Sequence, residues 1–259
     1  MDIDLTGKRA LVCGASKGMG RAIAEELAAL GAQVTVVARR GDVLEQVKSA
    51  LSGEGHHALA LDVSDTVRLK EKITAHVKEH GPFHILINNT GGPAAGPAHL
   101  AKAEDFEQAF RQHLLAGHTL VQALLDGMKG ENYGRIINII STSVKQPIKG
   151  LGVSNTIRGA VANWSKTLAG ELGPYGITVN NILPGPIDTD RMKEIVAGKA
   201  AKTGRSEEEI IAAEKAQVPV GRYGRPEEIA QAVAFLASPA AAYINGINLP
   251  VDGGRTSSL

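Results

Sequence analysis

The chain has 259 residues, of which 43% are hydrophobic and 21% charged, and its formal net charge at pH 7 is +1. This balance gives no reason to expect a nucleic-acid or membrane partner, and no apolar run reaches the roughly 20 residues of a membrane helix. The single cysteine, Cys13, excludes a disulfide within the chain and a multi-cysteine metal site, so we expect no metal and a reducing, cytoplasmic compartment.

Short apolar runs alternate with amphipathic patterns along the chain. Seven runs predict strands over Arg9–Cys13, Gln33–Ala38, His57–Leu61, His84–Asn88, Arg135–Ile140, Thr178–Leu183 and Asn248–Val251. Helices are predicted over Arg21–Leu30, Asp42–Leu51, Asp65–His80 (with Ser64 as its cap), Glu104–Lys129 and Val153–Leu172. Several strands are continuously apolar, which is typical of parallel strands covered on both faces. The alternation predicts one α/β domain, residues 1–259, with a doubly wound, Rossmann-type, seven-stranded parallel sheet.

Residues 188–217 interrupt this alternation. Two charged helical patterns, Asp190–Lys202 and Ser206–Ala216, are separated there by Thr203-Gly204. Insertions beyond the carboxyl end of a strand often cover ligands, so we expect a substrate lid inserted within the domain. A solvated pair of helices is the competing interpretation.

A glycine-rich loop follows the first predicted strand. Glycine allows tight turns and close backbone approach, and a helix start attracts anions, so this loop is expected to bind phosphate. Without further motifs, the same cluster of glycines could equally form an ordinary turn. The loop residues expected to bind the cofactor are Gly14, Ser16, Lys17, Gly18, Met19 and Gly20.

The end of the second predicted strand indicates which dinucleotide binds. An acidic residue there would bind the ribose hydroxyls of NAD, whereas this chain has Arg39 and Arg40. Two guanidinium groups, together with Lys17, suit a 2′-phosphate, so NADP(H) is favoured over NAD(H). The alternative is that Arg39 and Arg40 are ordinary surface charges.

Further motifs follow in a fixed order. They are Asp62-Val63, Asn88-Asn89-Thr90-Gly91, the segment 180–189, the segment 221–230 and Val251-Asp252-Gly253-Gly254. In this order and spacing they resemble the short-chain dehydrogenase/reductase family over about Leu5 to Gly254. The resemblance implies cofactor contacts from Asp62, Val63, Asn89, Gly91, Pro184, Gly185, Ile187 and Thr189. It also implies a homodimer or homotetramer that pairs through Glu104–Lys129 and Val153–Leu172; burial of these helices within a monomer is the competing explanation.

The catalytic positions depart from the family pattern. The family uses a Tyr, a Lys four residues later, a Ser thirteen residues before the Tyr, and an Asn on the preceding long helix. Ser141 matches the Ser, but Ser154, Arg158 and His113 stand at the Tyr, Lys and Asn positions. Cys13 replaces the usual Thr before the first glycine, and Asn88-Asn89-Thr90-Gly91 matches a family pattern that reads N-N-A-G.

The replaced residues change the chemistry that is expected. A serine hydroxyl is a far weaker acid than a phenol, and arginine stays protonated near neutral pH. We expect Ser141 and Ser154 to bind the substrate oxygen. Arg158 is expected to supply positive charge and contact the nicotinamide ribose, and a water linked to His113, which ordinarily titrates near neutrality, to supply the proton. A purely structural histidine is the alternative.

The resemblance implies an NADP(H)-dependent oxidoreductase that reduces a carbonyl, or oxidises an alcohol, of a small-molecule substrate. The nearest functional description is a 3-oxoacyl-carrier reductase-like enzyme. A non-catalytic NADP(H)-binding sensor or partner subunit is the alternative, because the cofactor motifs are complete while the proton-transfer positions are altered.

Overall fold

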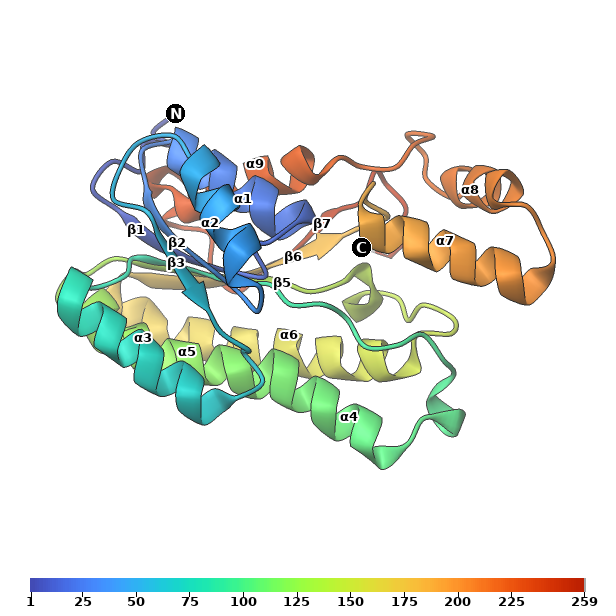
Figure 1. Cartoon of the computed structure of the whole chain (residues 1–259), viewed down its shortest axis with the longest axis horizontal. Coiled ribbons are helices and arrows are strands. Elements are labelled where there is room, and N and C mark those ends of the chain that lie inside the picture. Colours follow the sequence, from blue (N-terminus) through green and yellow to red (C-terminus); the bar gives the residue numbers. More distant parts are fainter. Residues whose placement is uncertain (259) are drawn as a thin grey trace.

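Apolar residues at successive strand positions face opposite sides of a single parallel sheet. In the computed structural model, which describes residues 1–258, the strand order is β3-β2-β1-β4-β5-β6-β7 (Figure 1). The strands are β1 Arg9–Cys13, β2 Gln33–Ala38, β3 His57–Ala60, β4 Ile85–Asn88, β5 Gly134–Ile139, β6 Ile177–Pro184 and β7 Asn248–Val251. The predicted doubly wound, seven-stranded parallel sheet is confirmed, and no strand end differs from its prediction by more than one residue.

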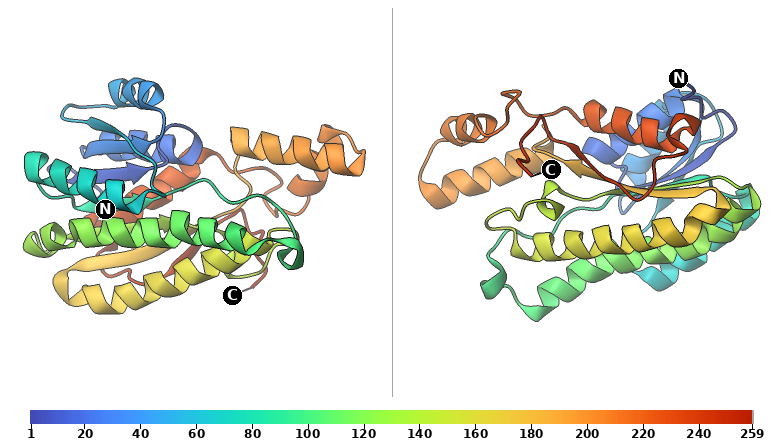
Figure 2. Two further views of the ribbon diagram at one scale, coloured as in Figure 1. Left: turned by 60° about the horizontal axis from the view of Figure 1, so that its bottom comes forward. Right: turned by 180° about the vertical axis from the view of Figure 1, so that it is seen from behind.

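Helices cover both faces of the sheet (Figures 1 and 2). One face carries α1 Gly18–Ala29, α2 Gly41–Ala50 and α9 Pro226–Ala237, and the other carries α3 Thr66–His80, α4 Ala103–Phe110, α5 Ala116–Gly130 and α6 Gly152–Leu172. Ile87 and Ile137 point into the first layer, while their neighbours Leu86 and Ile136 point into the second. This period of two explains why the strands read as continuously apolar.

Two further helices, α7 Asp190–Thr203 and α8 Glu207–Lys215, pack on each other and extend from the body of the protein (Figure 2). Short 3-10 turns occupy Ala98–Leu100, Thr142–Val144, Gly173–Tyr175 and Pro239–Ala241. Within the part of the chain that the structure describes, no helix combines the length and apolar character needed to cross a bilayer.

One predicted helix contains an unexpected turn, and one predicted cap is wrong. The predicted helix Glu104–Lys129 is present as a continuous run of α4, a five-residue π-helical turn at Arg111–Leu115, and α5. The apolar pattern does not show such a turn because it adds residues to a helix without breaking it. The cap of α3 is Asp65, whose carboxylate accepts a hydrogen bond from the Arg68 N–H, whereas the Ser64 hydroxyl donates to Asp62.

Four asparagines form a ladder across the middle of the sheet. Strand register places Asn88 opposite Asn138, Asn138 opposite Asn181, and Asn181 opposite Asn248. Their amide groups are joined by hydrogen bonds of 2.8, 3.0 and 2.8 Å in that order, and Asn138 also donates to the Ser165 hydroxyl of α6 at 2.9 Å. Because a slip of one residue would leave these buried amides unpaired, the ladder fixes the register of β4 to β7.

Candidate functional site

The glycine loop joins β1 to α1 at the carboxyl end of the sheet. Gly14 and Gly18 have φ values of +62° and +57°, which L side chains rarely adopt, and a Cβ on Gly20 would lie 2.2 Å from the Gly14 carbonyl oxygen. Asn89 supports the loop by donating to the carbonyls of Cys13 and Gly14 at 3.3 and 3.4 Å. The first N–H groups of α1 have no side-chain cap, so they are available to an anion.

The next predicted cofactor residues lie around the end of β2. Arg39 and Arg40 are exposed directly after this strand. The Asp62 carboxylate accepts hydrogen bonds from the Ser64 hydroxyl and N–H, which lower its pKa, and the charge of Arg39 lowers that pKa further. Arg39 and Asp62 are therefore electrostatic neighbours, with Val63 beside Asp62 half-buried.

The segment from Pro184 to Thr189 approaches the glycine loop from the other side. A Cβ built on Gly18 would lie 3.4 Å from the Thr189 methyl group, and Lys17 Nζ lies 3.8 Å from Asp190 Oδ2. Gly185 is required by packing, because a Cβ there would lie 2.6 Å from Asp252 Cα. The buried Ile187 continues the segment beneath this contact.

Arg158 is a buried cation without a carboxylate partner. Its side chain on α6 is 8% exposed, Nη1 donates to the Ile139 carbonyl at 3.0 Å, and Nε has no hydrogen-bond partner. Among the described residues, no acidic group forms an ion pair with it. Burial lowers the pKa of Arg158 to about 10, so the guanidinium remains charged at neutral pH. An uncompensated buried charge is costly, and such a group is a ready site for an anion.

His113 lies in the π-helical turn and faces the same region. Its Nδ1 is 2.5 Å from the Thr90 hydroxyl, and its Nε2 is buried without a partner. Burial, assisted by the charge of Arg158, lowers the pKa of His113 to about 3. The expectation that His113 titrates near neutrality is therefore wrong for this state of the protein, because an imidazolium beside a buried guanidinium is strongly disfavoured.

A small cavity connects these groups. It has a volume of about 20 Å³ and is lined by residues that include Cys13, Thr90, His113 and Arg158. A cavity of this size holds about one water molecule when polar partners are present, and the unpartnered atoms of His113 and Arg158 supply them. Burial raises the pKa of the Cys13 thiol to about 12, so Cys13 lines the cavity as an inert, uncharged group.

The two serines are placed differently. Ser141 caps a 3-10 turn, and its oxygen accepts the Ser143 N–H at 3.1 Å, which leaves its proton free to donate. Ser154 is half-buried on α6, one turn before Arg158 and on the same helix face.

Thr90 is a residue of the site that the sequence analysis did not predict. The feature that could have indicated it is the Thr in place of Ala in the Asn88–Gly91 motif.

The fold and the site define a dinucleotide-binding α/β protein, with its site where the strands of a doubly wound sheet end. A family model described as enoyl-(acyl carrier protein) reductase matches residues 14–256. The chain is 37% identical to a 3-oxoacyl-[acyl-carrier-protein] reductase of Vibrio cholerae over 97% of this chain and 98% of that protein. The chain thus belongs to the short-chain dehydrogenase/reductase family.

Other relatives act on sugars and sugar acids. A gluconate 5-dehydrogenase of Gluconobacter oxydans is 33% identical, with 98% of this chain and 97% of that protein covered. The crystal structure of L-sorbose reductase from Gluconobacter frateurii, complexed with NADPH and L-sorbose, superposes with a TM-score of 0.93 at 29% identity, covering all of both chains. These relatives are oxidoreductases with different substrates, so family membership does not identify the substrate of this chain.

Proposed function

We propose that this protein is an NADP(H)-dependent oxidoreductase that reduces a carbonyl to an alcohol, or catalyses the reverse reaction, with Arg158 as its central charged group. The single observation that carries the proposal is the buried guanidinium of Arg158, which has no carboxylate partner within residues 1–258 and borders a cavity at the carboxyl end of the sheet. Reduction of a carbonyl builds negative charge on oxygen, and a fixed cation in a dry site stabilises that charge.

The chain's residues fit the dinucleotide. The uncapped start of α1, with Lys17 beside it, would hold the diphosphate, and Arg39 would bind the 2′-phosphate of NADP(H) next to Asp62. Backbone groups of 184–189 and the Thr189 hydroxyl would hold the nicotinamide end. When bound, NADPH supplies the hydride. The remaining proposed contacts come from Gly14, Ser16, Gly18, Met19, Gly20, Arg40, Val63, Asn89, Gly91, Pro184, Gly185 and Ile187.

The proton would arrive from solvent through an atypical relay. Ser141 and Ser154 would bind the substrate oxygen, because the Ser141 proton is free to donate. A water in the cavity would connect that oxygen to His113 Nε2. In the reduction, neutral His113 would release the proton on Nε2 to the cavity water and accept the Thr90 hydroxyl proton at Nδ1, and solvent would return a proton to Thr90. No imidazolium has to accumulate, which agrees with its low pKa.

The departures from the family pattern support a catalytic site over a degenerate one. Cys13, Thr90, His113 and Arg158 all line one cavity, and Thr90 and His113 are hydrogen-bonded to each other. A hydrogen-bonded histidine beside a water-sized cavity is what a proton relay requires, whereas a non-catalytic NADP(H)-binding protein needs only that its buried residues pack. Measured turnover separates the two roles.

Residues 188–217, which include the helices α7 and α8, would act as a substrate lid. The position of Asp190 supports this proposal, because its carboxylate lies 3.8 Å from Lys17 Nζ of the glycine loop.

The substrate would be a small-molecule carbonyl or alcohol, with 3-oxoacyl thioesters and sugar-derived ketones as first candidates because relatives act on them. We propose a cytoplasmic homodimer or homotetramer that pairs through the faces of α4 to α6.

The test uses the purified full-length protein. NADPH binding is measured by fluorescence, and NADPH oxidation is then followed across 3-oxoacyl thioesters, sugar ketones, simple ketones and quinones. The proposal is supported if the wild-type protein turns over and Arg158→Met reduces that turnover by about 100-fold. The affinity of the variant for NADPH should stay within a few-fold of the wild-type value. Tight NADPH binding without turnover across the panel, in wild type and variant alike, favours the non-catalytic alternative.

A further inference from the structure

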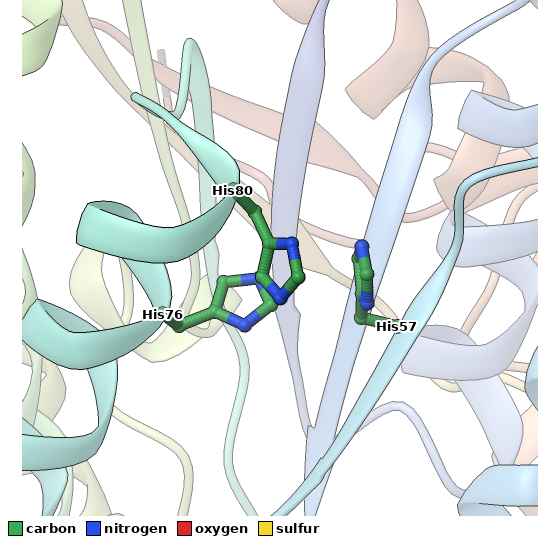
Figure 3. A group of neighbouring side chains, drawn as sticks. All are labelled: His57, His76 and His80. Carbon is green, nitrogen blue, oxygen red and sulfur yellow. The ribbon is translucent and has the colours of Figure 1, made fainter.

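Three histidines gather at the edge of the sheet, outside the site described above (Figure 3). His57 is the first residue of the edge strand β3, while His76 and His80 lie in the last turns of α3. In a parallel sheet the start of a strand lies at the opposite end from the glycine loop. The cluster is therefore separate from the proposed cofactor site.

The three rings converge on one point. Figure 3 shows His76 and His80 projecting from the helix toward His57 on the strand. Ring centroids are 4.1 Å apart for His57 and His80, 4.4 Å for His76 and His80, and 5.0 Å for His57 and His76. One ring nitrogen of each residue lies within 4.8 Å of the other two. The pair His76 and His80 has the i, i+4 spacing that places two imidazoles on one helix face.

These distances match what a metal ion requires. In a tetrahedral zinc site with Zn–N bonds of about 2.0–2.1 Å, ligand nitrogens lie about 3.4 Å apart. The ring nitrogens of the cluster lie within 4.8 Å of one another, so a bound ion would draw them closer by rotation of the side chains. Three converging imidazoles with no carboxylate between them are otherwise a poor packing choice, because each ring presents a polar nitrogen to another.

Contacts from neighbouring elements fix the His76 ring. The ring stacks on Phe83 at 5.6 Å between centroids, and its Nε2 lies 3.3 Å from the Thr35 hydroxyl on β2. A partner on one ring nitrogen is typical of a histidine whose other nitrogen binds a metal, because the partner fixes the orientation of the ring.

Charged groups around the cluster offset one another. The Glu79 carboxylate lies 3.6 Å from His80 Nε2 and favours a cation. Lys48 is the positive charge that faces His57, and it forms an ion pair with Glu45. Glu79 therefore offsets the positive charge of Lys48 at the cluster and is near enough to supply a fourth ligand.

We propose that His57, His76 and His80 form a binding site for a divalent transition-metal ion, zinc in the first place, that clamps the edge strand β3 to the last turns of α3. Imidazole ligands exclude calcium and magnesium, which require oxygen ligands, and three imidazoles with the Glu79 carboxylate as fourth ligand suit a closed tetrahedral zinc site. The ion ties the exposed edge of the sheet to its covering helix. Its role is structural, since it stabilises the folded chain by binding only that state.

The test is zinc binding to full-length protein that has been treated with a chelator. Zinc chloride is titrated by calorimetry, and the melting temperature is measured with zinc chloride or magnesium chloride. His57→Gln and His80→Gln remove half-buried ligands, and His99→Gln removes an exposed histidine elsewhere as the matched control. Circular dichroism without zinc shows whether each variant is folded, and NADPH fluorescence shows whether the cofactor site is intact.

Wild type and His99→Gln are expected to bind one zinc ion per chain and to melt at a higher temperature with zinc but not with magnesium. Both cluster variants are expected to bind zinc more weakly than wild type. The loss of affinity should exceed the roughly 10- to 100-fold that removal of an outer-shell partner costs, because each variant removes a direct ligand. The absence of saturable zinc binding by wild type overturns the proposal, as does equal binding by folded His57→Gln or His80→Gln.

Discussion

The Thr90 hydroxyl and the His113 ring, which come from different segments of the chain, are joined by a hydrogen bond of 2.5 Å between Oγ1 and Nδ1. Thr90 directly follows the Asn88-Asn89 pair at the end of β4, and His113 lies in the π-helical turn between α4 and α5. The hydrogen bond shows that these two residues, which are distant in the sequence, form one structural unit.

The pairing of Thr90 and His113 predicts energetic coupling. Thr90→Ala leaves a buried ring nitrogen without a partner and should lower the free energy of unfolding by about 1–3 kcal/mol. In a His113→Asn background the same substitution should cost less, giving a coupling energy of about 0.5–3 kcal/mol in a double-mutant cycle by urea unfolding. Strictly additive effects of the two substitutions contradict the pairing.

The low pKa of His113 predicts acid sensitivity. Its ordinary pKa is 6.5, and the folded state lowers it to about 3. Above pH 6.5 the ring is neutral in both states, so stability is at its full value. As pH falls toward 3, only the unfolded chain takes up the proton, and this one group lowers stability by about 1.4 kcal/mol per pH unit. Urea unfolding from pH 7 to pH 5 should therefore show a smaller pH dependence in His113→Asn than in wild type; equal slopes contradict the assignment.

Arg158 should contribute more to kcat than to the free energy of unfolding. Arg158→Met replaces an unpaired buried cation with an apolar chain of similar length, and removal of its desolvation cost should leave the free energy of unfolding unchanged or about 1 kcal/mol higher. The same variant should lower kcat by about 100-fold, the usual effect of losing one oxyanion donor. A large loss of stability with unchanged kcat indicates a purely structural arginine.

Much of the fold followed from the sequence because its causes are local or repetitive. Buried parallel strands such as β4 and β5 need continuous apolar runs, and a glycine with positive φ, such as Gly14, leaves a visible signal. The π-helical turn around His113 leaves none, since its residues continue the helical pattern. The low pKa of His113 likewise depends on burial first and on the charge of Arg158 second, and both arise only through tertiary packing.

The histidine cluster shows the same limit. The i, i+4 spacing of His76 and His80 is visible in the sequence, but a helical histidine pair alone is an ordinary surface feature. The third member, His57, joins it only because β3 pairs in parallel with β2 at the sheet edge beside α3. The expectation of no metal rested on the single cysteine, which excludes cysteine sites and says nothing about imidazole sites.

The charge at the end of β2 predicts cofactor selectivity. Arg39→Asp should weaken NADPH binding by about 10- to 100-fold, because a hydrogen bond to a charged group contributes about 1.5–3 kcal/mol, and should leave NADH binding within a few-fold. Arg68→Asp makes the same charge change at an exposed position on α3 and serves as the control. Fluorescence titration with both nucleotides checks the prediction, and an equal loss for NADH and NADPH excludes a 2′-phosphate contact.

The asparagine ladder predicts a large stability cost at its centre and a small one at its end. Asn138→Leu conserves volume but leaves the amide nitrogen of Asn88 and the amide oxygen of Asn181 without partners, while Ser165 keeps its hydrogen bond to the Val161 carbonyl. At about 1–3 kcal/mol for each such group, the free energy of unfolding should fall by at least about 2 kcal/mol. Asn248→Ala removes a single partner at the half-buried edge of the ladder and should cost about 1 kcal/mol. Urea unfolding of both variants checks the prediction, and equal costs at Asn138 and Asn248 contradict it.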